Sequence, residues 1–128
     1  MSPSLYEIIS QGGSLMNVIV AKAQQEQENP ENVKRYAGEL KRTVSTLQKV
    51  NTDEFSVEGK QRFKGILSEI DDAASQLTDE CDDPQTLMHL TGGELKSLLS
   101  QFGDLLKSER PEIRGKGFWE SIKERFKK

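Results

Sequence analysis

Apolar residues recur every three or four positions along most of the chain, which is the spacing that places side chains on one face of an α-helix. The pattern is clearest between residues 57 and 80, where we predict a helix roughly 36 Å long at 1.5 Å per residue. Its predicted core stripe consists of Phe63, Ile66, Leu67, Ile70, Ala74, Leu77 and Cys81.

The first segment has the same helical period, and we predict a helix over residues 4–27. Ser4 stands three residues before Glu7, in the spacing of a capping box. Gly12 and Gly13 are its weak point, because each glycine costs about 1 kcal/mol relative to alanine inside a helix. We therefore expect a bend or a break there. The predicted core positions are Leu5, Ile8, Ile9, Leu15, Met16, Ile19 and Ala23.

The second segment begins at Asn29 and Pro30, a capping residue followed by proline at the first helical position. Its apolar stripe consists of Val33, Tyr36, Ala37, Leu40, Val44 and Leu47. The opposite arc is basic and carries Lys34, Arg35, Lys41, Arg42 and Lys49. Charges opposite a core stripe occur on any surface helix, so an ordinary solvated face and a binding face both remain open.

The fourth segment has two helical starts. Asp83 and Pro84 predict a short helix over PQTLMHL, and Thr91 with Glu94 predicts a second capping box before a helix over 92–108. Four amphipathic segments joined by short turns bury their stripes most simply as a bundle. We predict an all-α fold: a four-helix bundle over residues 1–109, with a short extra helix before the fourth long one.

Residues 110–128 are predicted to form a linker and an amphipathic C-terminal helix. At 100° per residue, Phe118, Trp119, Ile122 and Phe126 fall within an arc of roughly 100°. Basic residues flank this arc or lie behind it: Lys116, Lys123, Arg125, Lys127 and Lys128. This pattern is typical of a helix at a membrane interface. The same stripe could instead cover a groove of the bundle, and both alternatives remain open.

Charge is unevenly distributed along the chain, whose net charge is -3. Residues 114–128 hold six basic and two acidic residues, a net +4, whereas the other 113 residues hold 12 and 19, a net -7. An acidic body with a basic end argues against general nucleic-acid binding and for a local contact made by that end. With four prolines and 6% aromatic residues, the composition also favours helices over sheet.

A cytosolic location is the expectation from the single cysteine, Cys81, which cannot form an internal disulfide. The N-terminal residues have no positive flank, and no apolar run approaches the ~18 residues that cross a bilayer.

No group of residues predicts catalysis, a metal site or a cofactor. His89 is the single histidine, and we interpret it as a packed or capping residue. The acidic run DECDD lacks the alternating oxygen ligands, the central glycine and the distal glutamate of an EF-hand loop. Acidic residues at a helix C-terminus oppose the helix dipole, so we expect an exposed, loosely held turn there.

Four stretches carry a resemblance to a known family: YEIISQGGSL, ENVKRYAGELKRTVSTLQKV, GKQRFKGILSEIDDAASQL and LMHLTGGELKSLLSQFGDLL. Over about residues 4–108 the chain resembles the HeLo-like four-helix bundles, which include the N-terminal domain of the mixed lineage kinase domain-like pseudokinase, fungal HeLo cell-death domains and N-terminal helical domains of plant resistance proteins. The resemblance rests on the order of helices and turns. The chain departs from the family in its acidic bundle and in carrying no kinase or nucleotide-binding domain.

The resemblance implies a cytosolic bundle that oligomerises and attacks the inner face of the plasma membrane in cell death or innate defence. It implies lipid contacts at Lys34, Arg35, Lys41 and Arg42, and a brace-like role for residues 117–127. We therefore expect a non-enzymatic, peripherally membrane-associated protein. Its expected partners are anionic phospholipids and further copies of itself. The alternative is a helical adaptor or regulator that binds another protein.

Overall fold

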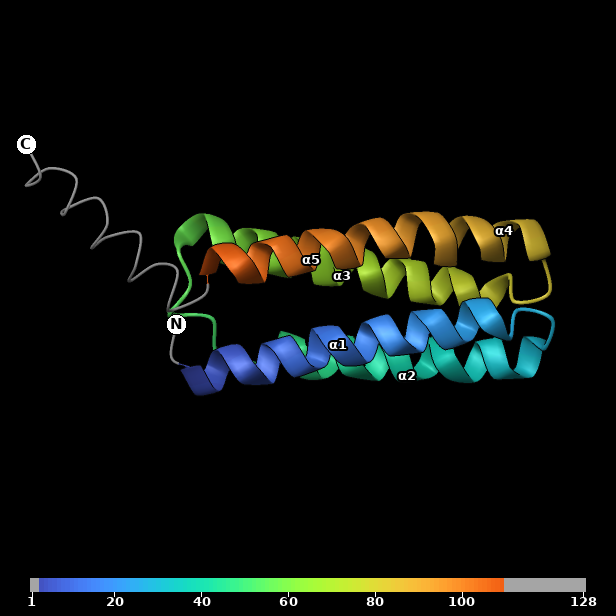
Figure 1. Cartoon of the computed structure of the whole chain (residues 1–128), viewed down its shortest axis with the longest axis horizontal. Helices are drawn as coiled ribbons and strands as arrows, with labels where there is room; N and C mark the ends of the chain where they lie inside the picture. Colours follow the sequence, from blue (N-terminus) through green and yellow to red (C-terminus); the bar gives the residue numbers. More distant parts are fainter. Residues whose placement is uncertain (1–2, 110–128) are drawn as a thin grey trace, which may run out of the picture.

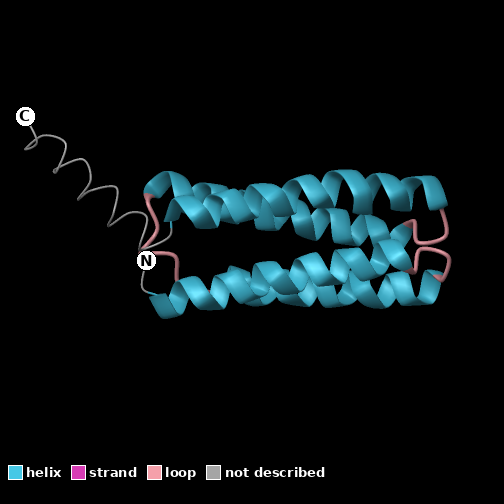
Figure 2. Cartoon of the chain, in the orientation of Figure 1, coloured by secondary structure: helices cyan, strands magenta, loops and turns pink. Residues whose placement is uncertain are grey.

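The protein is described here by a computed structural model, which covers residues 3–109. The elements in chain order are α1 (Pro3–Gln25), α2 (Pro30–Gln48), α3 (Val57–Asp79), α4 (Pro84–His89), a π-helical turn (Leu90–Glu94) and α5 (Leu95–Glu109). Helices joined by short loops make up residues 3–109, with no strand among them (Figure 2). The predicted all-α bundle is confirmed, whereas the predicted C-terminal helix lies outside the described residues.

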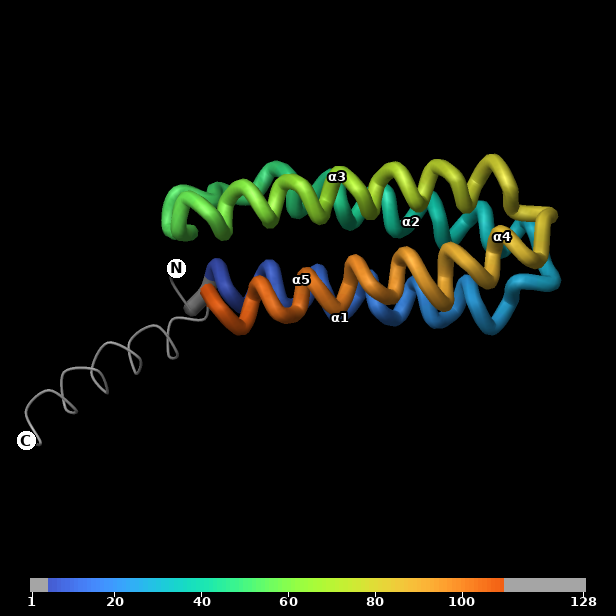
Figure 3. Tube along the Cα trace, turned by 90° about the horizontal axis from the view of Figure 1, so that it is seen from above, coloured from blue at the N-terminus to red at the C-terminus, as the bar shows by residue number. Residues whose placement is uncertain are grey.

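Four long helices lie side by side, each packed against two neighbours. α1 and α2 form one pair and α3 and α5 the other (Figure 1). In the view turned by 90°, α1 lies along α5 and α2 lies along α3 (Figure 3). The bundle therefore has an α1–α2 side and an opposite α3–α5 side.

The core is built from the predicted stripe of α3. Phe63 is 1% exposed and lies between Phe55, at 5.1 Å between ring centroids, and Phe102 of α5, at 5.8 Å. The other α3 stripe residues, Ile66, Leu67, Ile70, Ala74, Leu77 and Cys81, are buried as expected. Aromatic contacts therefore join the α2–α3 connection, α3 and α5 at one end of the bundle.

The expected bend at Gly12 and Gly13 is wrong, because α1 is continuous from Pro3 to Gln25. A Cβ atom at Gly12 would lie 2.7 Å from Cδ2 of Leu47 in α2, and one at Gly13 would lie 2.9 Å from Cε1 of Phe102 in α5. The two glycines let α1 approach both neighbours closely. Packing against these helices outweighs the low helix propensity of glycine.

Two of the four predicted caps are confirmed. Asn29 caps α2 by accepting a hydrogen bond from the backbone N–H of Asn32, and Asp83 caps α4 by accepting from Gln85. The capping box at Ser4 is wrong, since α1 already begins at Pro3, and a proline's fixed φ suits the first helical turn.

The second capping box, at Thr91, is also wrong. Thr91 lies within the π-helical turn and its hydroxyl donates to the backbone carbonyl of Leu87 at 2.7 Å. A threonine that bonds the carbonyl four residues earlier stays inside a helix and does not start one. α4, the π-turn and α5 therefore follow one another without a break from Pro84 to Glu109.

Candidate functional site

The outward side of α1 carries large apolar residues. Ile8, Leu15 and Val18 are 52%, 50% and 49% exposed. We call these three residues the apolar stripe. The prediction that Ile8 and Leu15 lie in the core is wrong, because the apolar arc of α1 is wider than the part its two neighbours cover. Within α1, no charged residue occurs between Glu7 and Lys22.

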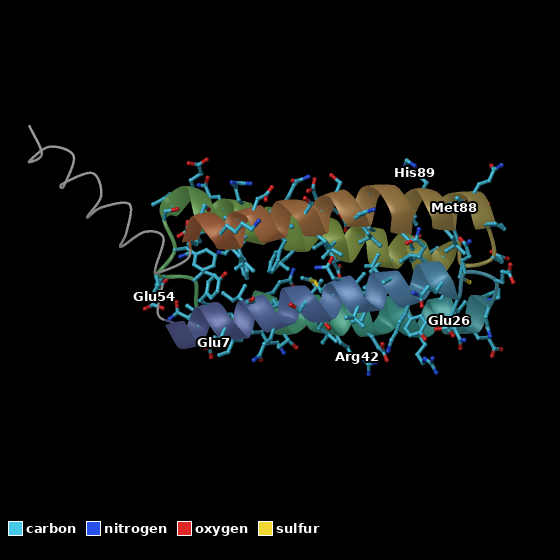
Figure 4. The ribbon with its side chains drawn as sticks, in the orientation of Figure 1. Glu7, Glu26, Arg42, Glu54, Met88 and His89 are labelled. Carbon is cyan, nitrogen blue, oxygen red and sulfur yellow. The ribbon has the colours of Figure 1, made fainter. Side chains whose placement is uncertain are left out.

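A groove runs between the apolar stripe and α2. It has a volume of about 300 Å³ and is lined by Ile8, Gln11, Gly12, Leu15, Arg42, Thr43, Thr46 and Leu47. The hydroxyls of Thr43 and Thr46 donate to the backbone carbonyls of Glu39 and Arg42 in their own helix. The guanidinium of Arg42 is therefore the charged group of an otherwise neutral groove, and it points outward from this side of the bundle (Figure 4).

The predicted lipid-binding residues of α2 fall into two rows. Arg35 and Arg42 are exposed and seven residues apart, so they share one line along the helix with the exposed Lys49. We call Arg35, Arg42 and Lys49 the cationic ridge. Lys34 and Lys41 form a second line on the α3 side, where Nζ of Lys41 donates to the hydroxyl of Ser75 in α3. The two rows therefore point in different directions.

One end of the cationic ridge is fixed to α1 through Glu26. This carboxylate accepts hydrogen bonds from the phenol of Tyr36 and from the side-chain amide of Asn32 at 2.9 Å. The hydrogen bond to Glu26 raises the pKa of the Tyr36 phenol above its ordinary value of about 10. Arg35 stacks on the Tyr36 ring at 5.1 Å and donates to the phenol oxygen, which opposes that rise.

Most of the acidic residues among 3–109 come after α2 in the sequence. Residues 65–95, which span most of α3, α4 and the π-turn, contain eight acidic residues and no lysine or arginine. Glu69 lies with Arg62 and Gln101 around a pocket between α3 and α5, on the side opposite α1–α2. Most of the acidic residues among 3–109 are therefore away from the apolar stripe, whereas Glu26 and Glu39 lie close enough to the cationic ridge to interact with Arg35.

The acidic turn after α3 is exposed at Asp79, Asp82 and Asp83, as expected, but the expectation that it is loosely held is wrong. The Asp83 carboxylate accepts from the backbone N–H of Gln85 and the hydroxyl of Thr86, and Cys81 is buried. Capping of α4 therefore organises the turn.

The single histidine of the chain, His89, is the last residue of α4. His89 is exposed and makes no capping hydrogen bond, so its interpretation as a packed or capping residue is wrong. Figure 4 shows His89 and Met88 pointing outward from α4. No group of three or more His, Cys, Asp or Glu residues in the described part of the chain could hold a metal ion.

The nine predicted lipid-contact residues of the C-terminal segment, Lys116 to Lys128, lie outside the described residues. The apolar stripe was missed as a surface. The signal that could have revealed it is the run of fourteen uncharged residues from Ile8 to Ala21.

Within residues 3–109, no helix combines the length and apolar character needed to cross a membrane. Comparisons with protein-family models, curated proteins and solved structures found no match. The resemblance to HeLo-like bundles stays a prediction.

Proposed function

We propose that the protein is a non-enzymatic helical bundle that binds anionic membranes peripherally through its α1–α2 side. The observation that carries this proposal is the groove in which Ile8 and Leu15 of the apolar stripe lie beside Arg42 of the cationic ridge. Apolar side chains next to basic ones suit the boundary between acyl chains and anionic headgroups. The acidic residues of α3 and of the turn that follows it would then face away from the lipid.

The cationic ridge favours an anionic surface over a second copy of the chain. A two-fold dimer formed through the apolar stripe with its two α1 helices antiparallel would bring two cationic ridges close to each other, and like charges facing each other across an interface oppose association. An anionic bilayer would instead attract both ridge and Lys22.

Magnitudes indicate weak, reversible binding by this side alone. Burying the exposed half of three apolar side chains gives ~3 kcal/mol in total. Three ridge cations near an anionic leaflet add ~3 kcal/mol. The sum corresponds to a partition constant of about 10⁴ M⁻¹, comparable to a single myristoyl chain.

Firm attachment at that strength needs a second contact, and the basic, aromatic segment around Phe118, Trp119, Ile122 and Phe126 is its candidate. Oligomerisation and permeabilisation, which the family resemblance implies, would follow attachment as a separate step. Release of a trapped dye from vesicles distinguishes that step from binding.

The test is co-sedimentation with phosphatidylserine vesicles, with phosphatidylcholine vesicles as the neutral comparison. Ile8→Glu with Leu15→Glu should weaken binding at least tenfold, because two apolar contacts are lost and two negative charges are added. Val57→Glu with Met88→Glu is the matched control, since these two residues are also apolar and exposed, at 78% and 60%, but lie in α3 and α4. Equal binding by both variants would remove the apolar stripe from the mechanism.

A helical adaptor or regulator of another protein is the second candidate function. The groove of about 300 Å³ between α1 and α2 favours it, because amphipathic partner helices dock their apolar residues in such grooves. Capture of a defined partner that is lost with Leu15→Glu, together with no vesicle binding at any salt concentration, would support this function over the first.

A further inference from the structure

The N-terminus of α3 is capped by residues from two distant parts of the chain. The hydroxyl oxygen of Ser56 accepts the backbone N–H of Gly59 at 3.0 Å. The carboxylate of Glu109, at the end of α5, accepts from the Ser56 hydroxyl at 2.5 Å and from the Ser56 backbone N–H at 3.4 Å. Ser56 and Glu109 are 53 residues apart in the sequence.

This arrangement reproduces a capping box with one member supplied by another helix. In a capping box, the residue three positions after the cap is a Glu or Gln whose side chain reaches back to the N–H of the capping residue. That position here is Gly59, and Glu109 makes the hydrogen bond instead. A Cβ atom at Gly59 would lie 2.0 Å from Oε1 of Glu109, so the absence of a side chain at Gly59 creates the space that Glu109 occupies.

The N-terminus of α3 compensates for the burial of the Glu109 carboxylate. Glu109 is 4% exposed, and a carboxylate is costly to bury unless it is hydrogen-bonded. The N-terminus of α3 supplies donors and a favourable helix dipole for a negative charge. A neighbouring pocket of about 340 Å³, lined in part by Arg62, Leu105 and Ser108, leaves room for the carboxylate to move out of this position.

We propose that Ser56, Gly59 and Glu109 form a latch that ties the last turn of α5 to the first turn of α3. While it is closed, the end of α5 is held at the N-terminus of α3. When it opens, the last turn of α5 is released. Residues 110–128 follow Glu109 in the sequence, so the latch holds the residue to which this basic segment is joined. This inference does not rest on membrane binding.

The substitution Gly59→Glu should open the latch while leaving the N-terminus of α3 capped. The new glutamate completes the capping box within α3 and excludes Glu109 from its position. Backbone hydrogen exchange followed by NMR should show the first turn of α3 protected as before. Exchange in Leu105–Glu109 should be about tenfold faster or more, the effect of losing a hydrogen bond to a charged group. Gly65→Glu is the control, because a Cβ at Gly65 meets nothing within 4 Å.

Two further variants keep the inference testable if Gly59→Glu fails to fold. Glu109→Ala should accelerate exchange in the last turn of α5 and have a smaller effect on the first turn of α3. Ser56→Ala should accelerate exchange in both of these turns. Unchanged protection of Leu105–Glu109 in Glu109→Ala would overturn the latch. Equal acceleration of exchange in the last turn of α5 and the first turn of α3 in Gly59→Glu would also overturn the latch. The new glutamate would then not have replaced Glu109 as the partner of Ser56.

Discussion

α1 and α3 are both 23 residues long, and both bury one apolar stripe, but their outward sides differ. α3 carries eight charged residues, whereas α1 carries only Glu7 and Lys22. The charged residues on the outward side of α3 are typical of a helix that faces water. The outward side of α1 exposes isoleucine, leucine and valine in its place.

This difference identifies the side of the bundle that is suited to a contact. A single exposed apolar residue is ordinary, but a row of three on a helix with only two charged residues marks an interaction surface. The two helices therefore serve as an internal comparison. A change on the α1–α2 side and the same change on α3 should have different outcomes, and two such contrasts follow, with a smaller effect expected within the α1–α2 side.

The largest expected effect is on vesicle binding, and it contrasts Arg42 with Lys64. Arg42→Glu and Lys64→Glu change the net charge equally, but only Arg42 belongs to the cationic ridge. Reversing Arg42 should weaken binding to phosphatidylserine vesicles about 30-fold, from ~2 kcal/mol of lost electrostatic attraction. Lys64→Glu should have little effect. An equal loss in both variants, measured by co-sedimentation at fixed salt, would mean that net charge alone governs binding.

The second contrast concerns stability and compares Gly13 of α1 with Gly65 of α3. Gly13→Ala should destabilise the fold by about 1–2 kcal/mol, because the added Cβ meets the buried ring of Phe102. Gly65→Ala should stabilise it by about 0.5–1 kcal/mol through better helix propensity, since the site is open. Urea unfolding measures both, and the same sign in both would show that Phe102 moves aside without cost.

The smallest effect is expected at the contact between Tyr36 and Glu26. Since folding raises the pKa of the Tyr36 phenol, the stabilisation is fully present below about pH 10 and is lost as the pH rises through the folded-state pKa. Ultraviolet titration of a Tyr6→Phe variant isolates Tyr36, because the chain has two tyrosines. Adding Glu26→Gln should lower the Tyr36 pKa. An unchanged pKa would show that Glu26 is not the cause.

Local signals predicted most of the fold. The period of α3 identified its core residues, and Asn29–Pro30 and Asp83–Pro84 marked the starts of α2 and α4, because these signals depend on neighbouring residues alone. Thr91 shows their limit. The pattern T-x-x-E occurs both at a helix start and inside a helix. Here Thr91 lies inside a helix because its hydroxyl can donate to the carbonyl of Leu87 in the preceding turn.

The candidate site was harder to predict because it depends on what covers each helix. A wide apolar arc on α1 does not reveal how much of it α2 and α5 bury, so Ile8 and Leu15 were assigned to the core. The partnership of Glu109 with Ser56 has no local signal at all, since the two residues meet only when α5 returns to the start of α3. The sequence predicted the basic residues of α2. It did not predict that Lys41 contacts α3 while Arg42 points away from it, because this depends on where α3 packs.

The π-helical turn between α4 and α5 allows an angular adjustment along a continuous backbone. One extra residue in a helical turn rotates everything before it by about 100° relative to everything after it. The direction in which α4 presents Met88 and His89 is thereby set separately from the direction in which α5 presents its core residues. Insertion or loss of a single residue at Gly92–Gly93 would rotate α4 relative to α5 and leave the orientation of the other helices unchanged.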